Sequence, residues 1–237
     1  MLQNRIPRRT VAAAGLTLLG CTSANAALMS YTDFTVFESE LAASGLTAKR
    51  QGFDDISAGT VINTGDVLGG FTFSGISLVD GQLAVVAPTD STETRSPPNA
   101  IGTDGPADQQ MRNPDSFTLT FPDSYAFGLW FIAEPDFAAD DDFSVTLPDV
   151  AGEPSQGSVA ADAVELNDNF SSWFIGFTDS ASPFTKATIA STDDFSEGTF
   201  LFRVDDFYTA EQAPLPTTLA LLALGAGILG FRLRRTG

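Results

Sequence analysis

Apolar and polar residues alternate with a period of two through much of the middle of the chain. The alternation is regular in three stretches, 71–74, 117–121 and 143–147. Successive side chains of a strand point to opposite faces, so this period indicates strands with one buried face. Short apolar runs, typical of strands buried on both faces, lie at 83–86, 127–132 and 173–177. A last strand is expected over 199–207, and turn residues occur at 79–81 and 121–124.

These many short strands predict an all-β fold, an antiparallel jelly-roll-like β-sandwich. The chain contains 20 Phe, and most of them fall at inward positions of the expected strands. We therefore expect the phenylalanines to form the sandwich core rather than an aromatic binding platform. One stretch, 87–115, is rich in Pro, Gly, Thr, Asp and Ser and has little periodicity. Long loops tend to be functional or disordered, so this stretch is the first place where we expect a ligand contact.

One short segment before the strands has a helical period instead. Thr35 and Glu38 have the spacing of a capping box, in which each side chain bonds a free backbone N–H of the first turn. Phe37 and Leu41 are four residues apart and share one helical face, and Gly45 is suited to end a helix. We predict a helix over 35–44 that leans on the sandwich.

The N-terminal residues 1–26 have the pattern of a signal peptide. Three arginines precede a short apolar run, and Ala24-Asn25-Ala26 fits a signal-peptidase cleavage site. Two alternatives remain open. Arg8-Arg9 fits part of a twin-arginine signal. Leu18-Leu19-Gly20-Cys21 resembles a lipobox, in which Cys21 would be lipidated, although Ala24-Asn25-Ala26 is the better cleavage site.

The C-terminal residues 213–237 combine a proline motif at 213–216, an apolar run at 217–231 and a basic end at 232–237. As a helix the apolar run would be about 22 Å long, shorter than the roughly 30 Å hydrocarbon core of a bilayer. The arginines after it favour a cytoplasmic C-terminus. A permanent single-span anchor and a temporary tether both fit this segment. The expected organisation is thus a signal peptide, a sandwich over 27–208, a linker over 209–212 and the C-terminal segment.

The composition changes which partners are expected. The formal net charge is −18, and all 30 acidic residues lie between the two terminal segments, which hold half of the 12 basic residues. This charge argues against nucleic acid and anionic lipid surfaces as partners, and it is compatible with divalent cations, neutral glycans or simple solubility. The only cysteine is Cys21, so we expect no disulfide in the mature protein.

The chain contains no His, which excludes Ser-His-Asp and Cys-His catalysis and most zinc sites. No catalytic residue stands out, although two carboxylates suffice for a glycoside hydrolase. Calcium is the better-motivated cofactor, because it prefers carboxylate and carbonyl oxygens. The pairs Asp54-Asp55 and Asp205-Asp206 would meet if the first and last strands are neighbours, and 140–142 and 193–194 are further acidic runs. Adjacent strand residues face opposite sides, so at most one Asp of each pair is expected at a site.

A Pro-x-Pro motif, a short apolar helix and an arginine cluster at the C-terminus resemble a PEP-CTERM sorting signal of the VPLPA-type variant. The same family model is sometimes labelled an ice-binding protein C-terminal domain, a label that does not imply ice binding. By position, the resemblance makes Ala213, Pro214, Leu215 and Pro216 the recognition motif and Arg232, Arg234 and Arg235 the stop. Ala213 stands where the variant has Val, and Thr217 where it has Ala. The resemblance implies export across the inner membrane of a Gram-negative bacterium and processing by an exosortase.

The middle of the chain is also similar to ectodomains that accompany this tail, which look like jelly-roll sandwiches of the carbohydrate-binding type. The similar segments are 52–55, 70–73, 96–102, 126–128, 183–185 and 205–207. Together these resemblances imply a non-enzymatic surface or matrix protein, associated with exopolysaccharide in a biofilm and processed by signal peptidase and exosortase. A glycan-binding module using the 87–115 stretch, Trp130 or Trp173 is the alternative, although both tryptophans lie in apolar runs typical of a core. A carboxylate-dependent hydrolase is a third possibility.

Overall fold

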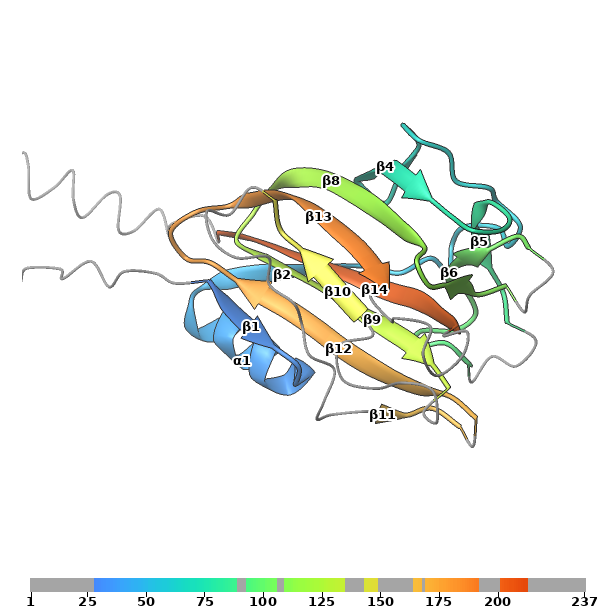
Figure 1. The fold of residues 1–237 in the computed structure, drawn as a ribbon. Coiled ribbons are helices and arrows are strands. Elements are labelled where there is room, and N and C mark those ends of the chain that lie inside the picture. Colours follow the sequence, from blue (N-terminus) through green and yellow to red (C-terminus); the bar gives the residue numbers. More distant parts are fainter. Residues whose placement is uncertain are drawn as a thin grey trace, which may run out of the picture.

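Two antiparallel sheets stack face to face, and one short helix covers part of the outside of the larger sheet (Figure 1). The computed structural model describes residues 28–88, 93–105, 109–134, 143–148, 164–167, 169–191 and 201–212. The expected signal peptide, Cys21, the C-terminal segment 213–237 and the acidic runs 140–142 and 193–194 lie outside these residues. Within the described part of the chain, no helix has the length and apolar character needed to cross a membrane.

The larger sheet has nine strands among the described residues. They are β1 (Met29–Tyr31), β2 (Leu46–Gln51), β5 (Leu83–Val86), β6 (Ala100–Thr103), β7 (Met111–Arg112), β9 (Ala126–Ala133), β11 (Val164–Glu165), β12 (Ser171–Thr178) and β14 (Leu201–Gln212). The smaller sheet consists of β3 (Val67–Leu68), β4 (Phe71–Ser77), β8 (Ser116–Ser124), β10 (Phe143–Thr146) and β13 (Phe184–Ser191).

The strand order explains how distant segments meet. The path through the larger sheet is β1-β12-β9-β14-β6-β5, with β2 and β7 also paired to β14 and β11 paired to β12. The smaller sheet follows the order β10-β13-β8-β4-β3. The chain crosses from one sheet to the other between β8, β9 and β10, and again between β12, β13 and β14. The predicted antiparallel β-sandwich with one short helix is therefore confirmed.

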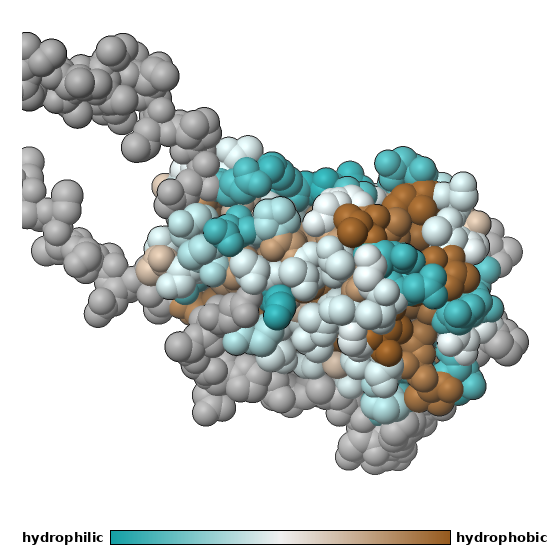
Figure 2. Space-filling model, turned by 90° about the horizontal axis from the view of Figure 1, so that it is seen from above, coloured by the Kyte–Doolittle hydropathy of each residue, from teal (hydrophilic) through white to brown (hydrophobic). Residues whose placement is uncertain are grey.

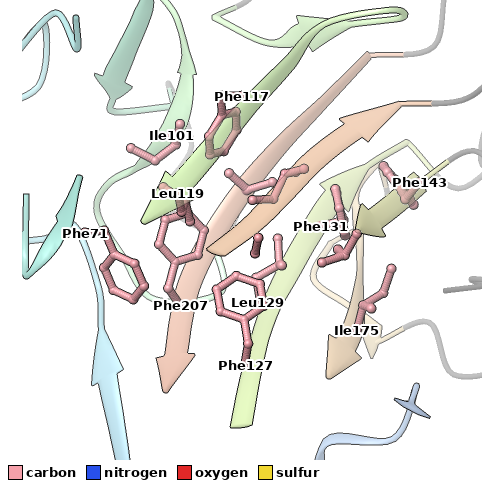
Figure 3. Packing of buried hydrophobic residues seen from close by; sticks show 14 of the residues in the cluster. Phe71, Ile101, Phe117, Leu119, Phe127, Leu129, Phe131, Phe143, Ile175 and Phe207 are labelled. Carbon is pink, nitrogen blue, oxygen red and sulfur yellow. The ribbon is translucent and has the colours of Figure 1, made fainter. Parts of the chain in front are cut away.

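Phenylalanine packing forms the core, as the period-two pattern predicts. Every described phenylalanine is buried except Phe34, which is half-buried. Rings from both sheets meet between the layers, and Figure 3 shows Phe71 and Phe207 side by side at one end, with ring centroids 5.2 Å apart. Burying each such side chain contributes roughly 1.5–3 kcal/mol, and favourable ring pairs add about 0.5–1.5 kcal/mol. Aromatic residues thus make up about half of the core cluster, and aliphatic residues the rest.

The helix α1 (Phe34–Ala43) begins one residue before the predicted start, and its cap differs from the prediction. The N-cap is Asp33, whose carboxylate accepts the backbone N–H groups of Thr35 and Val36. Thr35 therefore lies inside the first turn, and the capping-box assignment was wrong. Phe37 and Leu41 are buried as expected, against Trp130 and Phe174 on the outside of the larger sheet. Gly45 follows the helix with a φ of +66°, a conformation that glycine adopts easily.

Three other predicted boundaries differ from the structure. Residues 121–124 were expected as a turn, but they are the last residues of β8. The expected linker 209–212 continues β14 and pairs with β2. The stretch 87–115 contains β6 and β7 rather than one long loop. In each case strand pairing overrides a local composition of Pro, Asp, Thr or Gln.

The outer face of the smaller sheet is mixed in character. Figure 2, seen from above in the frame of Figure 1, shows hydrophilic residues over much of this face and apolar residues gathered toward one end. Val67 in β3 and Val79 after β4 are large apolar residues that are more than half exposed. Isolated exposed valines are common on protein surfaces and do not by themselves indicate a binding site.

Candidate functional site

The strand β14 carries a bulge in its middle that brings two neighbouring carboxylates to one side. Its register with β9 shifts between Asp205 and Tyr208, and Asp206 has a φ of +46°. A bulge of this kind re-aims side chains that would otherwise alternate. Ser96 Oγ consequently lies near both carboxylates, at 2.8 Å from Asp206 and 3.4 Å from Asp205. The expectation that at most one Asp of the pair faces a given site was therefore wrong.

Asp205 is fully buried, and backbone donors surround its carboxylate. Its Oδ2 atom accepts hydrogen bonds from the N–H groups of Arg95 and Ser96, both at 2.9 Å. Its Oδ1 atom accepts the N–H of Asp206 at 2.8 Å. These bonds fasten the segment 93–99 onto the middle of β14.

Asp206 and Asp54 connect this network to β2 and to the residues that follow it. Arg50 Nε lies 2.8 Å from Asp206 Oδ1, in an ion pair between β2 and β14. The backbone N–H of Asn99 donates to Asp54, and the Asn99 side chain donates to the carbonyl oxygens of Phe53 and Ile56. Together, Asp54, Asp205 and Asp206 and the residues that bond them form what we call the aspartate cluster.

The pairing of β2 with β14 explains why the aspartate cluster forms. Gln51 lies opposite Phe207, so the residues after β2 reach the middle of β14. The sequence expectation depended on the first and last strands being neighbours; it is β2 that lies beside the last described strand, whereas β1 pairs with β12. Asp54 is close enough to Asp205 for its charge to affect the Asp205 pKa. Asp55 lies beside Asp54 at the rim of a surface hollow, next to Gly52.

Burial, and after it the neighbouring charge of Asp206, raise the pKa of Asp205 to about 7. Asp54 adds a smaller effect in the same direction, whereas the N–H donors of Ser96 and Asp206 oppose it. A carboxyl group with such a pKa in an accessible cleft would be a candidate general acid. Asp205 and Asp206 are instead both buried, and Ser96 of the segment 93–99 donates hydrogen bonds to both carboxylates.

The same network bears on the expected calcium site. Among the described residues, no group of three or more Asp, Glu, His or Cys side chains is arranged to hold a metal ion. The oxygens of Asp205 already accept backbone N–H groups, and Asp206 is paired with Arg50 and Ser96. Calcium binding by Asp54, Asp55, Asp205 and Asp206 stays a prediction from the sequence.

The described part of the 87–115 stretch packs on the sandwich, with Thr94, Ser96 and Asn99 buried and Arg95, Pro97 and Pro98 exposed. Besides bonding Asp205, the segment 93–99 places the Arg95 guanidinium over Trp130, 4.4 Å from the ring centroid, in cation–π geometry. Trp130 and Trp173 are both buried, the first under Arg95 and α1 and the second in the core between the sheets. Neither tryptophan offers an exposed face for stacking on a sugar.

A second polar region, which sequence reasoning missed, lies at the end of the same strand. Here the side chains of β2, β8 and β14 and the turn before β4 enclose a hollow of about 430 Å³, which we call the edge hollow. Its lining includes Lys49, Gln51, Asp123, Thr209 and Glu211. The available signal was the period-two pattern itself, which continues past the apolar core positions with polar residues at 209 and 211.

The chain was also compared with known proteins. No protein-family model, curated protein or solved structure matches the chain.

Proposed function

We propose that this chain is an exported, non-enzymatic surface or matrix protein that is sorted through a PEP-CTERM-like C-terminal signal and associates with exopolysaccharide. The proposal begins from the two terminal segments, 1–26 and 213–237, whose patterns resemble a signal peptide and a sorting signal. They imply processing by signal peptidase and exosortase, and a transient stay in the inner membrane of a Gram-negative bacterium.

One structural observation carries the proposal further. The last strand of the sandwich, β14, continues to Gln212, and the predicted recognition motif begins at the next residue, Ala213. The final residues of β14 are paired with β2 through Gln212 and Leu46. Cleavage at the motif would therefore release a sandwich that keeps all of its described strands. A cut placed before residue 209 would instead remove four of the six residue pairs between β2 and β14.

The described residues also support a non-enzymatic role. The carboxyl group with the clearest catalytic character, Asp205, is buried and bonded to backbone N–H groups. A general acid must come within hydrogen-bond reach of the atom that it protonates. Asp205 fails this requirement as long as the segment 93–99 lies over it.

The sorting proposal is tested by intact-mass measurement and terminal sequencing of the protein from its native host. We expect a mature chain that begins near Ala27 and lacks the residues after the 213–216 motif. The double substitution Pro214→Ala/Pro216→Ala should leave the tail attached and the protein in the inner membrane. Pro148→Ala, at an exposed proline within the sandwich, is the matched control and should be processed normally.

The host strain without its exosortase should behave like the double variant. Normal mass and normal release in that strain would refute sorting by this route. Normal processing of the Pro214→Ala/Pro216→Ala chain would show that the proline motif is not the recognition element.

A further inference from the structure

The last two residues of β14 are held by fewer partners than the residues before them. From Tyr208 to Ala210 the strand lies between two neighbours, β9 on one side and β2 on the other. Beyond Ala210, β2 is the only described strand that pairs with it, at Glu211 and Gln212. The number of partner strands thus falls from two to one just before the predicted sorting motif.

Ala210 is the last residue of β14 that is firmly fixed. It is fully buried. Its backbone N–H donates to Ser124 Oγ at 2.9 Å, and its carbonyl oxygen accepts the N–H of Tyr125 at 2.8 Å. Pulling Ala210 out of the sheet would leave these buried groups without partners, which is costly. An opening that begins at the C-terminal end of β14 therefore stops before Ala210.

The contacts beyond Ala210 are exposed to solvent. Glu211 forms an ion pair with Lys49, and the two side chains are 49% and 59% exposed. Exposed ion pairs contribute little to stability. Thr47, which lies opposite Glu211, is exposed as well. Strand ends with few buried contacts open at a much lower free energy than the core of a fold.

The position of β2 does not depend on these last two pairs. Leu46, at the start of β2, packs against the apolar cluster that includes Phe37 of α1. Further along the strand, Arg50 forms an ion pair with the buried Asp206. Glu211 and Gln212 therefore leave β2 and return to it while β2 itself stays in place.

The short spacing to the motif connects this opening with processing. Pro214 is four residues after Ala210, a span of at most about 14 Å in an extended chain. Three residues lie between them, and two of these, Glu211 and Gln212, are paired with β2. An enzyme that cuts a polypeptide takes up an extended segment, and a segment paired in a sheet must first come free.

We propose that Glu211 and Gln212 leave β2 and enter the processing enzyme together with the motif, so that their pairs with β2 act as a latch on tail removal. While the latch is closed, the sandwich lies too close to Pro214 for the enzyme to take up the segment. The rate of tail removal follows the fraction of molecules in which the latch is open. This inference rests on the proposed sorting through the C-terminal signal and adds a controlling step to it.

The latch is tested with a cross-strand disulfide in the full chain in its native host. Thr47 and Glu211 are directly opposite each other. The Cα atoms of such antiparallel pairs lie about 4.5–5.5 Å apart, within the range that a disulfide spans. The only natural cysteine, Cys21, lies in the expected signal peptide. In pulse-labelled cells, Thr47→Cys/Glu211→Cys should lose its tail about tenfold more slowly than the wild type, and a reductant in the medium should restore the rate.

Two further variants separate the latch from other effects of a disulfide. Thr72→Cys/Thr120→Cys joins opposite residues of β4 and β8, far along the chain from the tail, and should be processed like the wild type. A Gly-Ser-Gly-Ser insertion after Gln212 in the locked chain supplies unpaired residues before the motif. It should restore tail removal even while the disulfide is intact.

Thiol labelling shows whether each disulfide has formed. Unchanged tail removal in the oxidised Thr47→Cys/Glu211→Cys chain overturns the proposal, as does an equal delay in the β4–β8 control or a delay that persists after the insertion. If the disulfide does not form, Lys49→Glu decides, because it places like charges at the exposed pair and should speed tail removal severalfold. An unchanged rate in that variant overturns the latch. A wild-type chain that keeps its tail contradicts the proposed sorting instead, so the two failures are distinguishable.

Discussion

The middle and the end of β14 each carry an acidic side chain, which is buried in the middle and exposed at the end. In the aspartate cluster, Asp206 is only 4% exposed and the segment 93–99 closes over it and Asp205. In the edge hollow, Glu211 is 49% exposed and faces an open space between the sheets. Both acidic residues pair with a basic residue of β2, Arg50 in the first case and Lys49 in the second. Residue type and pairing are thus alike, and burial is what differs.

The difference determines what each carboxylate does. A buried carboxylate that accepts several backbone N–H groups holds segments together, and its removal leaves those donors without partners. An exposed ion pair contributes little to stability, typically up to about 1 kcal/mol, and its groups can exchange water for a ligand. The comparison predicts that substitutions in the cluster lower the stability of the fold, whereas substitutions in the edge hollow leave it nearly unchanged.

The largest effect is expected for Asp205→Ala. This change removes the acceptor for the N–H groups of Arg95, Ser96 and Asp206 in a buried place. At pH 5 we expect the free energy of unfolding to fall by on the order of 3 kcal/mol, measured by urea denaturation. A loss below about 1 kcal/mol would show that the cluster does not hold the 93–99 segment.

An intermediate effect is expected for Ser96→Ala, which removes the hydroxyl group that bonds Asp206 and lies near Asp205. A hydrogen bond to a charged group contributes about 1.5–3 kcal/mol, so the loss should be roughly 1–2 kcal/mol after local relaxation. Ser39→Ala is the matched control, because the Ser39 hydroxyl bonds a backbone carbonyl on the exposed side of α1. Equal losses for the two variants would contradict the distinction between a buried and an exposed hydroxyl.

The smallest effect on stability is expected in the edge hollow. Asp123→Asn and Thr209→Val should each leave the free energy of unfolding within about 0.5 kcal/mol of the wild type, because neither position is part of the buried core. Urea denaturation under the same conditions measures both. A loss above about 1 kcal/mol would mean that the hollow is a structural element and would remove the contrast with the cluster.

The fold could be predicted because its main signal is local. Apolar residues at alternate positions, such as Phe71 and Phe73 or Phe117 and Phe121 on either side of Leu119, predict strands with one buried face. These residues are buried in the structure. Phe37 and Leu41 also give a local signal: they are four residues apart, the spacing of one helical face, and both are buried in α1. The helix cap was missed because Asp33 and Thr35 are both good caps, and only the backbone geometry separates them.

The candidate site was predictable only in part. The meeting of Asp54 with Asp205 and Asp206 follows from neighbouring early and late strands. Their closure under the segment 93–99 depends on the bulge at Asp206, where a residue other than glycine has positive φ, and no sequence pattern reveals this. The edge hollow depends on how far the sheets separate beyond Phe207, which is a property of tertiary packing.

The central claim is that Asp205 is a buried structural carboxyl group, and the pH dependence of unfolding tests it most directly. Because burial raises its pKa to about 7 from an ordinary value of 3.8, the folded protein retains a proton that the unfolded chain releases. This group therefore stabilises the fold most at low pH, and its contribution is lost as the pH rises through that window.

The measurement is the free energy of unfolding from about pH 4 to about pH 8 for the wild type, Asp205→Asn and Asp123→Asn. The wild type and Asp123→Asn should lose stability by on the order of 3 kcal/mol more than Asp205→Asn over this range. Equal slopes for the wild type and Asp205→Asn would contradict the account, because Asp205 would then titrate as an ordinary exposed carboxyl group.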